Sequence, residues 1–164
     1  AAGAHQKREI EADVIVYATG FDTWTPRFPI VGRDGHALPS SATAMLGITT
    51  HGFPNFFMLL GPNTWVGHTS QIAIAESQAR YILSCMRMTL PPEHTIEVRI
   101  SAQKRFEHFL EKRFPNTVWH TCGGVGSWYV NPSTKRVDAI WPASTVEYMY
   151  RTRSASPKDY HIED

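Results

Sequence analysis

Residues 61–71, with the sequence GPNTWVGHTSQ, carry the residue types best suited to holding an anionic or electron-rich ligand. An apolar run precedes this segment and a helical pattern follows it, so it connects a strand to the start of a helix. The first N–H groups of a helix have no intrahelical acceptor, and the helix dipole is positive there. Ser70 and Gln71 are therefore candidates to receive a carboxylate or an electron-rich ring edge. A capped helix that holds no ligand fits the same pattern.

A second candidate is the turn that follows residues 13–18, within the sequence DVIVYATGF. This short apolar run is rich in β-branched residues, which predicts a buried strand of a parallel sheet covered on both faces. Gly20 permits a sharp bend and the close approach of another group. Ligands of α/β sheets bind beyond the carboxyl ends of strands, so this turn is a candidate wall of a ligand site. An ordinary strand and glycine turn would look the same.

Other chemistries find little support in the sequence. There are eight histidines, but no His-x-x-x-His or Cys-x-x-Cys pattern, and His120 with Cys122 is too little for a zinc site, so we predict no metal. A Gly-x-Ser-x-Gly motif is absent, which argues against a hydrolase. The net charge of +1 with no basic block predicts no nucleic-acid partner. No side chain stands out as a catalytic acid or base.

The elements that must position these residues indicate an α/β fold. Residues 56–60 (FFMLL) predict a second buried strand, and residues 69–88 predict a long helix that Pro91 and Pro92 end. The helix carries two apolar stripes, which predict that it is buried on more than one side. One stripe is Ile72, Ala75, Ala79, Ile82 and Met86, and the other is Ile74, Tyr81 and Cys85.

Further elements are predicted on either side of this helix. Residues 22–45 are expected to be loops with a tight turn at Asp34 and Gly35. Residues 95–100 alternate and predict a half-buried strand, and Ser101 is expected to cap a helix that runs to Arg113. The apolar face of that helix is Ala102, Phe106, Phe109 and Leu110, and its basic residues alternate with Glu107 and Glu111 on a solvated face. An ordered loop over 118–141, a short helix over 144–151 and loose ends at 1–11 and 152–164 complete the expectation.

The totals set the class of protein. A chain of 164 residues with 42% hydrophobic residues suits one domain with its own core. Its two cysteines, Cys85 and Cys122, lie far apart without a paired spacing, so we expect free thiols in a reducing compartment and a cytoplasmic location. No run of about 18 apolar residues exists, so we predict no transmembrane segment. No apolar leader follows the first residues.

Three motifs resemble the flavin-containing and Baeyer–Villiger monooxygenases. The strand DVIVYATGF resembles their Asp-x-x-x-x-Ala-Thr-Gly-aromatic signature, and LLGPNTWVGHTSQIAIAESQARYI resembles their segment near the C-terminus. Cys122, the run Ser127–Trp128–Tyr129 and the later Trp141–Pro142 resemble the third match. The matches occur in family order over most of the chain, so together they are fairly specific.

The resemblance implies a partial Rossmann-type FAD-binding domain and the cofactors FAD and NADPH. Thr19, Gly20 and Phe21 would lie between the FAD and NADP domains. Asn63, Ser70 and Gln71 would face the flavin, and the start of the helix would stabilise negative charge on it. Trp128 would lie on a mobile loop and donate its N–H to the bound NADP, although simple core packing of Trp128 is the alternative.

The family's Gly-x-Gly-x-x-Gly motifs are absent, because Gly123, Gly124 and Gly126 have the wrong spacing. We therefore expect the C-terminal segment of a longer flavoprotein, inactive alone, whose missing N-terminal part is its partner. The expected substrate is a small ketone that receives one oxygen atom beside its carbonyl. N- or S-oxidation is an alternative, and a non-catalytic truncated paralogue acting as an interaction module is another. The isolated chain is expected to bind FAD weakly and to be only marginally soluble.

Overall fold

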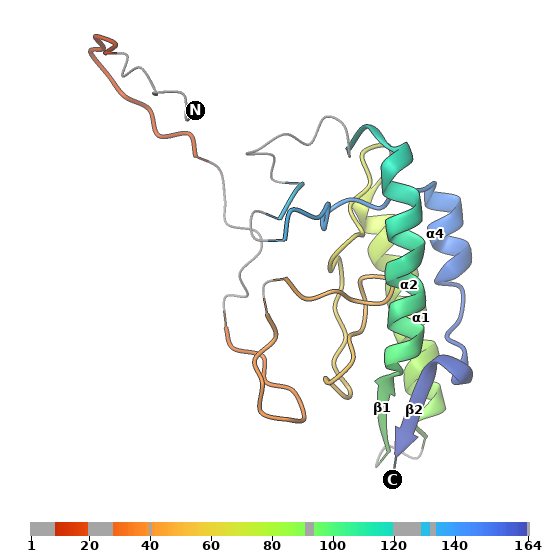
Figure 1. The fold of residues 1–164 in the computed structure, drawn as a ribbon. Helices are drawn as coiled ribbons and strands as arrows, with labels where there is room; N and C mark the ends of the chain where they lie inside the picture. Colours follow the sequence, from red (N-terminus) through yellow and green to blue (C-terminus); the bar gives the residue numbers. More distant parts are fainter. Residues whose placement is uncertain are drawn as a thin grey trace, which may run out of the picture.

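The computed structural model describes residues 9–19, 28–39, 41–90, 94–119, 129–131 and 134–163. Its helices are α1 (Gln71–Met88), α2 (Ile100–Arg113) and α4 (Thr145–Arg151), with 3-10 turns η1 (Phe114–Asn116) and η2 (Pro157–Asp159). Its strands are β1 (Thr95–Val98) and β2 (Tyr160–Glu163). Figure 1 shows the helices alongside one another, with the strand pair at one end next to the C-terminus.

Helix α1 forms where the sequence predicts it. The Ser70 hydroxyl caps it by accepting a hydrogen bond from the N–H two residues later, at 3.2 Å. Its buried face consists of Ile74, Ser77, Gln78, Tyr81 and Cys85. Polar members of that face are paired, since the Ser77 and Thr152 hydroxyls lie 2.6 Å apart and the Gln78 amide donates to the Tyr148 hydroxyl at 2.7 Å. The helix therefore packs on the core without leaving these groups unsatisfied.

The predicted stripe of α1 that contains Ile72 and Met86 is largely exposed, whereas the other predicted stripe is buried. Ile72 is 71% exposed, Leu83 is 52% exposed and Met86 is 53% exposed. The prediction that α1 is covered on more than one side is therefore wrong for this structure, because no described segment lies over that face.

Aromatic side chains from separate elements close the core. The rings of Phe106 on α2 and Trp141 stack with their centroids 6.3 Å apart, and Tyr148 on α4 meets Trp141 edge-on at 5.0 Å. The predicted apolar face of α2 is confirmed, with Phe106 and Leu110 buried and Phe109 packed against the core. The helix over 144–151 is confirmed as α4, capped by Ser144.

The start of α2 differs from the prediction. The helix begins at Ile100, and its N-cap residue is Arg99, which makes no side-chain capping bond. Ser101 therefore lies inside the first turn and caps nothing. The Arg99 backbone serves instead, because its carbonyl accepts from the N–H of Ala102 at 2.9 Å and its N–H donates to the Asp159 carbonyl at 2.8 Å.

The expectation of a loose end over 152–164 is wrong for its described residues. Strand β2 pairs antiparallel with β1, with Ile96 opposite Ile162 and Val98 opposite Tyr160. The Tyr160 side chain is 1% exposed and belongs to the core. Its hydroxyl donates to that of Tyr81 at 3.0 Å, which ties the C-terminal segment to α1.

The two predicted parallel strands do not form in the described residues. Residues 13–18 are extended without a strand partner, and Val14, Val16 and Tyr17 are 76%, 80% and 84% exposed. Residues 56–60 contain bends, and Leu59 is 55% exposed. A strand needs a neighbour for its backbone groups, and no described segment pairs along either run. The fold is thus helical with a small antiparallel sheet, which fits a partial α/β domain.

The loops are better predicted than these strands. Residues 28–39 form a turn around Asp34 and Gly35, with a bridge between Val31 and Ala37. In the region 118–141, the described residues include a bridge from Val130 to Val137. Among all described residues, no helix is long and apolar enough to cross a membrane.

Candidate functional site

The start of α1 is an exposed polar position of the fold. Ser70 has an extended backbone with φ −71° and ψ 129°, and its hydroxyl occupies one first-turn N–H group. The remaining first-turn donors have no intrahelical acceptor. No acidic residue lies in the first turn, and residues 67–70 are exposed. The position therefore offers hydrogen-bond donors and positive dipole to a ligand.

Gln71 carries an unsatisfied buried oxygen at this position. Its Nε2 donates to the Val66 carbonyl at 3.0 Å. Its Oε1 is buried without a hydrogen-bond partner, and it is the one such side-chain atom among the described residues. An unsatisfied buried acceptor costs about 1–3 kcal/mol, so a donor from outside the described residues would stabilise it.

Asn63 holds the loop that precedes α1. Its side chain is buried, and its Nδ2 donates to the carbonyls of Val137 at 2.8 Å and Ile140 at 3.3 Å. Its own N–H donates to the Asp138 carbonyl at 2.6 Å. These three bonds clamp the loop before α1 to residues 137–140. Asn63 and Gln71 were predicted to face a flavin, but the side-chain N–H groups of both donate to carbonyls of this chain.

A close backbone approach also fixes this loop. Gly47 has φ +65°, and a Cβ atom there would collide with the Thr64 side chain and lie 2.6 Å from the Pro62 carbonyl oxygen. Thr64 in turn donates to the Gly61 carbonyl at 2.6 Å. Only glycine combines this backbone angle with this contact. The turn at residue 47 thus holds the 61–64 loop in place.

Of the other predicted site residues, Thr19 is the one that the structure describes. Thr19 ends the exposed segment 9–19, which projects away from the helices in Figure 1. Gly20, Phe21 and Trp128 lie outside the described residues. The pairing of the turn after Tyr17 with the start of α1 therefore stays a prediction.

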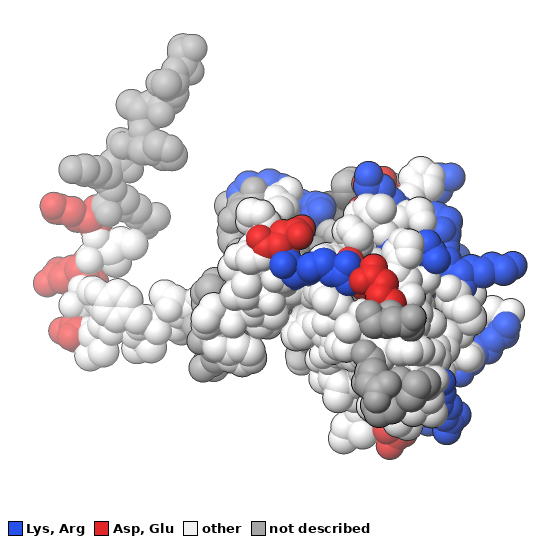
Figure 2. Space-filling model, turned by 90° about the horizontal axis from the view of Figure 1, so that it is seen from below, with Lys and Arg blue, Asp and Glu red and all other residues white. Residues whose placement is uncertain are grey.

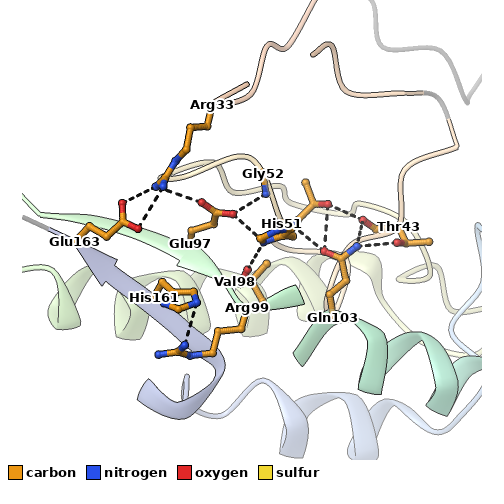
Figure 3. Close-up of polar contacts among 11 residues, drawn as sticks. Arg33, Thr43, His51, Gly52, Glu97, Val98, Arg99, Gln103, His161 and Glu163 are labelled. Atoms are coloured by element: carbon orange, nitrogen blue, oxygen red, sulfur yellow. Dashed lines mark hydrogen bonds and ion pairs between the residues drawn. The ribbon is translucent and has the colours of Figure 1, made fainter. Parts of the chain in front are cut away.

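A buried carboxylate that sequence reasoning missed anchors the loop beneath the site. Glu97 on β1 is 7% exposed. Figure 3 shows it between Arg33, at 3.3 Å, and the ring of His51, at 2.8 Å. The Gly52 N–H also donates to it at 2.8 Å. Arg33 reaches Glu163 on β2 as well, at 2.8 Å, and this contact lowers the pKa of the Glu163 carboxyl.

Gln103 on α2 extends the same anchor. Its Oε1 accepts from the backbone N–H of His51 at 2.8 Å, and its Nε2 donates to the Thr43 hydroxyl at 2.9 Å (Figure 3). Thr43 also donates to the carboxylate of Glu107. These bonds fix residues 43–51, which carry the Gly47 turn. The sequence holds no clear signal for this anchor, because Glu97 stands at a polar position of an alternating strand and Gln103 in a helix rich in charged residues.

The structure offers no metal centre in the part of the chain that it describes. No group of three His, Cys, Asp or Glu side chains gathers there. His68 instead meets the Thr145 hydroxyl at 2.9 Å and joins the loop before α1 to the start of α4. Cys85 is free and buried, and burial raises the pKa of its thiol to about 11.

Comparison with known proteins gives a consistent picture. No family model matches the chain. It is 37% identical over 162 residues to a Baeyer–Villiger monooxygenase of Pseudomonas aeruginosa, and 35% identical over 162 residues to one of Streptomyces coelicolor. Each match covers 94% of this chain and 31% of the relative. The chain thus spans about a third of the length of the curated relatives that it matches.

Solved structures agree on the fold. The structure of OTEMO in complex with FAD and NADP matches 92% of this chain and 31% of that one, with a TM-score of 0.68 and 24% identity. Cyclohexanone monooxygenase from Rhodococcus sp. Phi1 bound to NADP+ matches 84% of this chain and 27% of that one, with a TM-score of 0.64 and 22% identity. The chain is therefore a homologue, over nearly its whole length, of about one third of a flavin-dependent monooxygenase of the Baeyer–Villiger type.

Proposed function

We propose that this chain forms one side of the flavin site in a longer, FAD- and NADPH-dependent monooxygenase that inserts oxygen beside a ketone carbonyl. The observation that carries the proposal is the open start of α1 with the unpaired Oε1 of Gln71, in a chain homologous to these enzymes. By itself the chain is expected to be inactive, because it spans only about 31% of its relatives.

The residues at the start of α1 fit a flavin. The first-turn N–H groups and the helix dipole suit an electron-rich ring edge that gains negative charge on reduction. A ring N–H next to the Gln71 Oε1 would supply the donor that this atom lacks. The bound flavin would supply the redox chemistry, while the protein supplies orientation and charge. Asn63 would act by holding the loop rather than by touching the ring.

The exposed apolar stripe of α1 supports the proposal that another part of the same protein packs against this helix. On one face of α1 it contains Ile72, Ala79, Leu83 and Met86, which are exposed, and exposed Leu90 follows two residues after the helix ends. Covering the four large side chains would contribute about 1–2 kcal/mol each, which is a strong drive for association. We infer that the rest of the protein covers this stripe with a Rossmann-type parallel sheet, to which residues 13–18 add a strand.

The direct test uses the complete protein encoded by the gene that contains this sequence. It should purify with about one flavin per chain and should oxidise NADPH with a cyclic ketone, giving a lactone by mass spectrometry. The isolated 164-residue chain should hold no flavin. Turnover of a thioether or an amine instead of the ketone would favour heteroatom oxidation. If the gene encodes this chain alone and the protein is stable without flavin, the proposal that the chain belongs to a monooxygenase would be refuted.

Two matched variants test the covered stripe. Leu83→Glu should leave the isolated chain folded, because the side chain is already 52% exposed, but should cost the complete protein its flavin. Val146→Glu on α4 is the control, since Val146 is 76% exposed and lies off the stripe. Equal flavin content in both variants would show that nothing covers α1.

The role proposed for Trp128 has a separate test. If its indole N–H donates to bound NADP, Trp128→Phe in the complete protein should raise the KM for NADPH and leave the flavin content unchanged. A variant that loses flavin as well would indicate a packing role. The free thiol of Cys85 fits a reducing compartment, and we therefore propose a cytoplasmic location.

A further inference from the structure

A cavity that none of the above uses opens between α2, the end of α4 and the segment before β2. Its volume is about 330 Å³, at the lower end of small-molecule sites. Met45, Tyr81 and Phe106 line it, and all three belong to the buried core. The cavity therefore has an apolar floor suited to the carbon part of a ligand.

Three arginines and one carboxylate line the same cavity. These are Arg105, Arg151, Arg153 and Asp159, so the lining has an excess of two positive charges. Figure 2 shows Lys and Arg side chains gathered on the right of the view, the side on which Figure 1 places α4. A rim of this sign attracts anions.

The three arginines differ in how far they are neutralised. Arg105 pairs with Asp159 at 2.5 Å, and Arg151 pairs with Glu147 at 2.9 Å. Arg153 has no carboxylate partner in the described part of the chain and lies over the ring of Tyr150, 4.0 Å from its centre. Its guanidinium donors are therefore free to receive an anion while the ring holds the side chain at the rim.

Hydroxyl groups stand beside the free guanidinium. Ser154 and Ser156 both line the cavity and are exposed. The Ser156 hydroxyl makes no hydrogen bond within the described residues. Serine hydroxyls and an arginine fork are the donors that proteins use for phosphate oxygens.

We propose that this cavity binds an organic phosphate monoester. Arg153, whose guanidinium has no carboxylate partner in the described part of the chain, and Ser156 would donate to the phosphate oxygens, and Arg105 also lines the cavity. The carbon part of the ligand packs on Phe106 and Met45. A carboxylate of the same size carries half the charge and binds more weakly.

The test is a titration of the 164-residue chain followed by NMR, with phenyl phosphate as the probe. We expect saturable shifts in the arginine side-chain N–H signals. Benzoate and inorganic phosphate should each bind at least about tenfold more weakly, because benzoate carries one negative charge rather than two and inorganic phosphate lacks the apolar part. Arg153→Gln should weaken phenyl phosphate binding about tenfold, and it breaks no ion pair.

Arg80→Gln is the matched control, since Arg80 is an exposed arginine on α1 away from the cavity, and it should bind phenyl phosphate like the parent. An unchanged circular dichroism spectrum for both variants shows that the fold is intact. Shifts that do not saturate, equal affinity for benzoate or inorganic phosphate, or equal loss in the two variants would each overturn the proposal.

Discussion

Replacing Asn63 tests how the loop beneath the start of α1 is held. The buried Nδ2 donates to the carbonyls of Val137 and Ile140, and the backbone is left-handed with φ 59°. Asn63→Ala removes two hydrogen bonds, at about 0.5–1.5 kcal/mol each, and places alanine in a backbone region that costs it about 1–2 kcal/mol. We therefore expect a loss of about 2–5 kcal/mol in the free energy of unfolding.

Two further substitutions separate these contributions. Asn63→Gly loses the hydrogen bonds but tolerates the positive φ, and its looser unfolded state costs about 0.4–1 kcal/mol, so it should be roughly 0.5–1 kcal/mol milder than Asn63→Ala. Asn63→Asp keeps the shape but turns carboxylate oxygens toward the two carbonyls. It should be the most destabilising of the three at neutral pH.

Urea unfolding followed by circular dichroism and tryptophan fluorescence measures these differences at an unchanged m-value. Asn116→Ala is the control, because Asn116 is an exposed asparagine in η1, and it should change stability by less than about 0.5 kcal/mol. The reasoning fails if Asn63→Ala is as mild as this control. If Asn63 serves the flavin instead, its variants of the complete protein would lose flavin while keeping the parent's stability.

Three other perturbations have clear expected outcomes. Tyr148→Phe leaves the Gln78 amide without its acceptor and should lower stability by about 1–3 kcal/mol in urea unfolding. Because burial raises the pKa of Cys85 to about 11, the unfolded thiol ionises first, so stability falls by about 3 kcal/mol as the pH rises from about 8.5 to 11. Cys85→Ala should flatten that slope in unfolding curves taken across this range. Glu97→Gln should lower the free energy of unfolding by about 1–3 kcal/mol in urea unfolding. It replaces a buried carboxylate, which accepts a hydrogen bond from the Gly52 N–H, with a neutral amide.

Controls for these three are available in the same chain. Tyr150→Phe should leave the free energy of unfolding unchanged, because Tyr150 is 62% exposed. Glu163→Gln should cost less than about 1 kcal/mol, because its side chain is 52% exposed. A pH profile of Cys85→Ala parallel to that of the parent would mean that the buried tyrosines, whose pKa values are also raised by burial, carry the alkaline loss.

Helices were predictable because their signals are local. Ser70 before the apolar run and the proline pair after it bounded α1 to within about two residues. Strands were predicted less well, and of the predicted strands only β1 forms in the described residues, because strands depend on partners distant in sequence. Residues 13–18 look like a core strand but find no neighbour in the described chain. Tyr160–Glu163 looked like a tail, yet it pairs with β1 some 65 residues earlier in the chain.

The burial of Glu97 shows a second limit of sequence reasoning. Alternation over 95–100 predicted that this residue points to solvent, and a strand forms there over residues 95–98. What buries the carboxylate is a loop far away in sequence, which delivers Arg33 and the Gly52 N–H to it. No periodicity carries that information, because a charge is tolerated inside only when distant partners satisfy it.

The candidate site is therefore complete on one side and open on the other. Below the start of α1, the Asn63 clamp and the contact of Gly47 with the 61–64 loop fix the backbone without any ligand. Above it, the Gln71 Oε1 has no donor, and Ile72 next to it is 71% exposed. A surface that is already rigid pays little ordering entropy when a cofactor and the rest of the protein arrive. The contribution of this chain would then be to present the helix start in its final geometry, with affinity supplied largely by groups outside it.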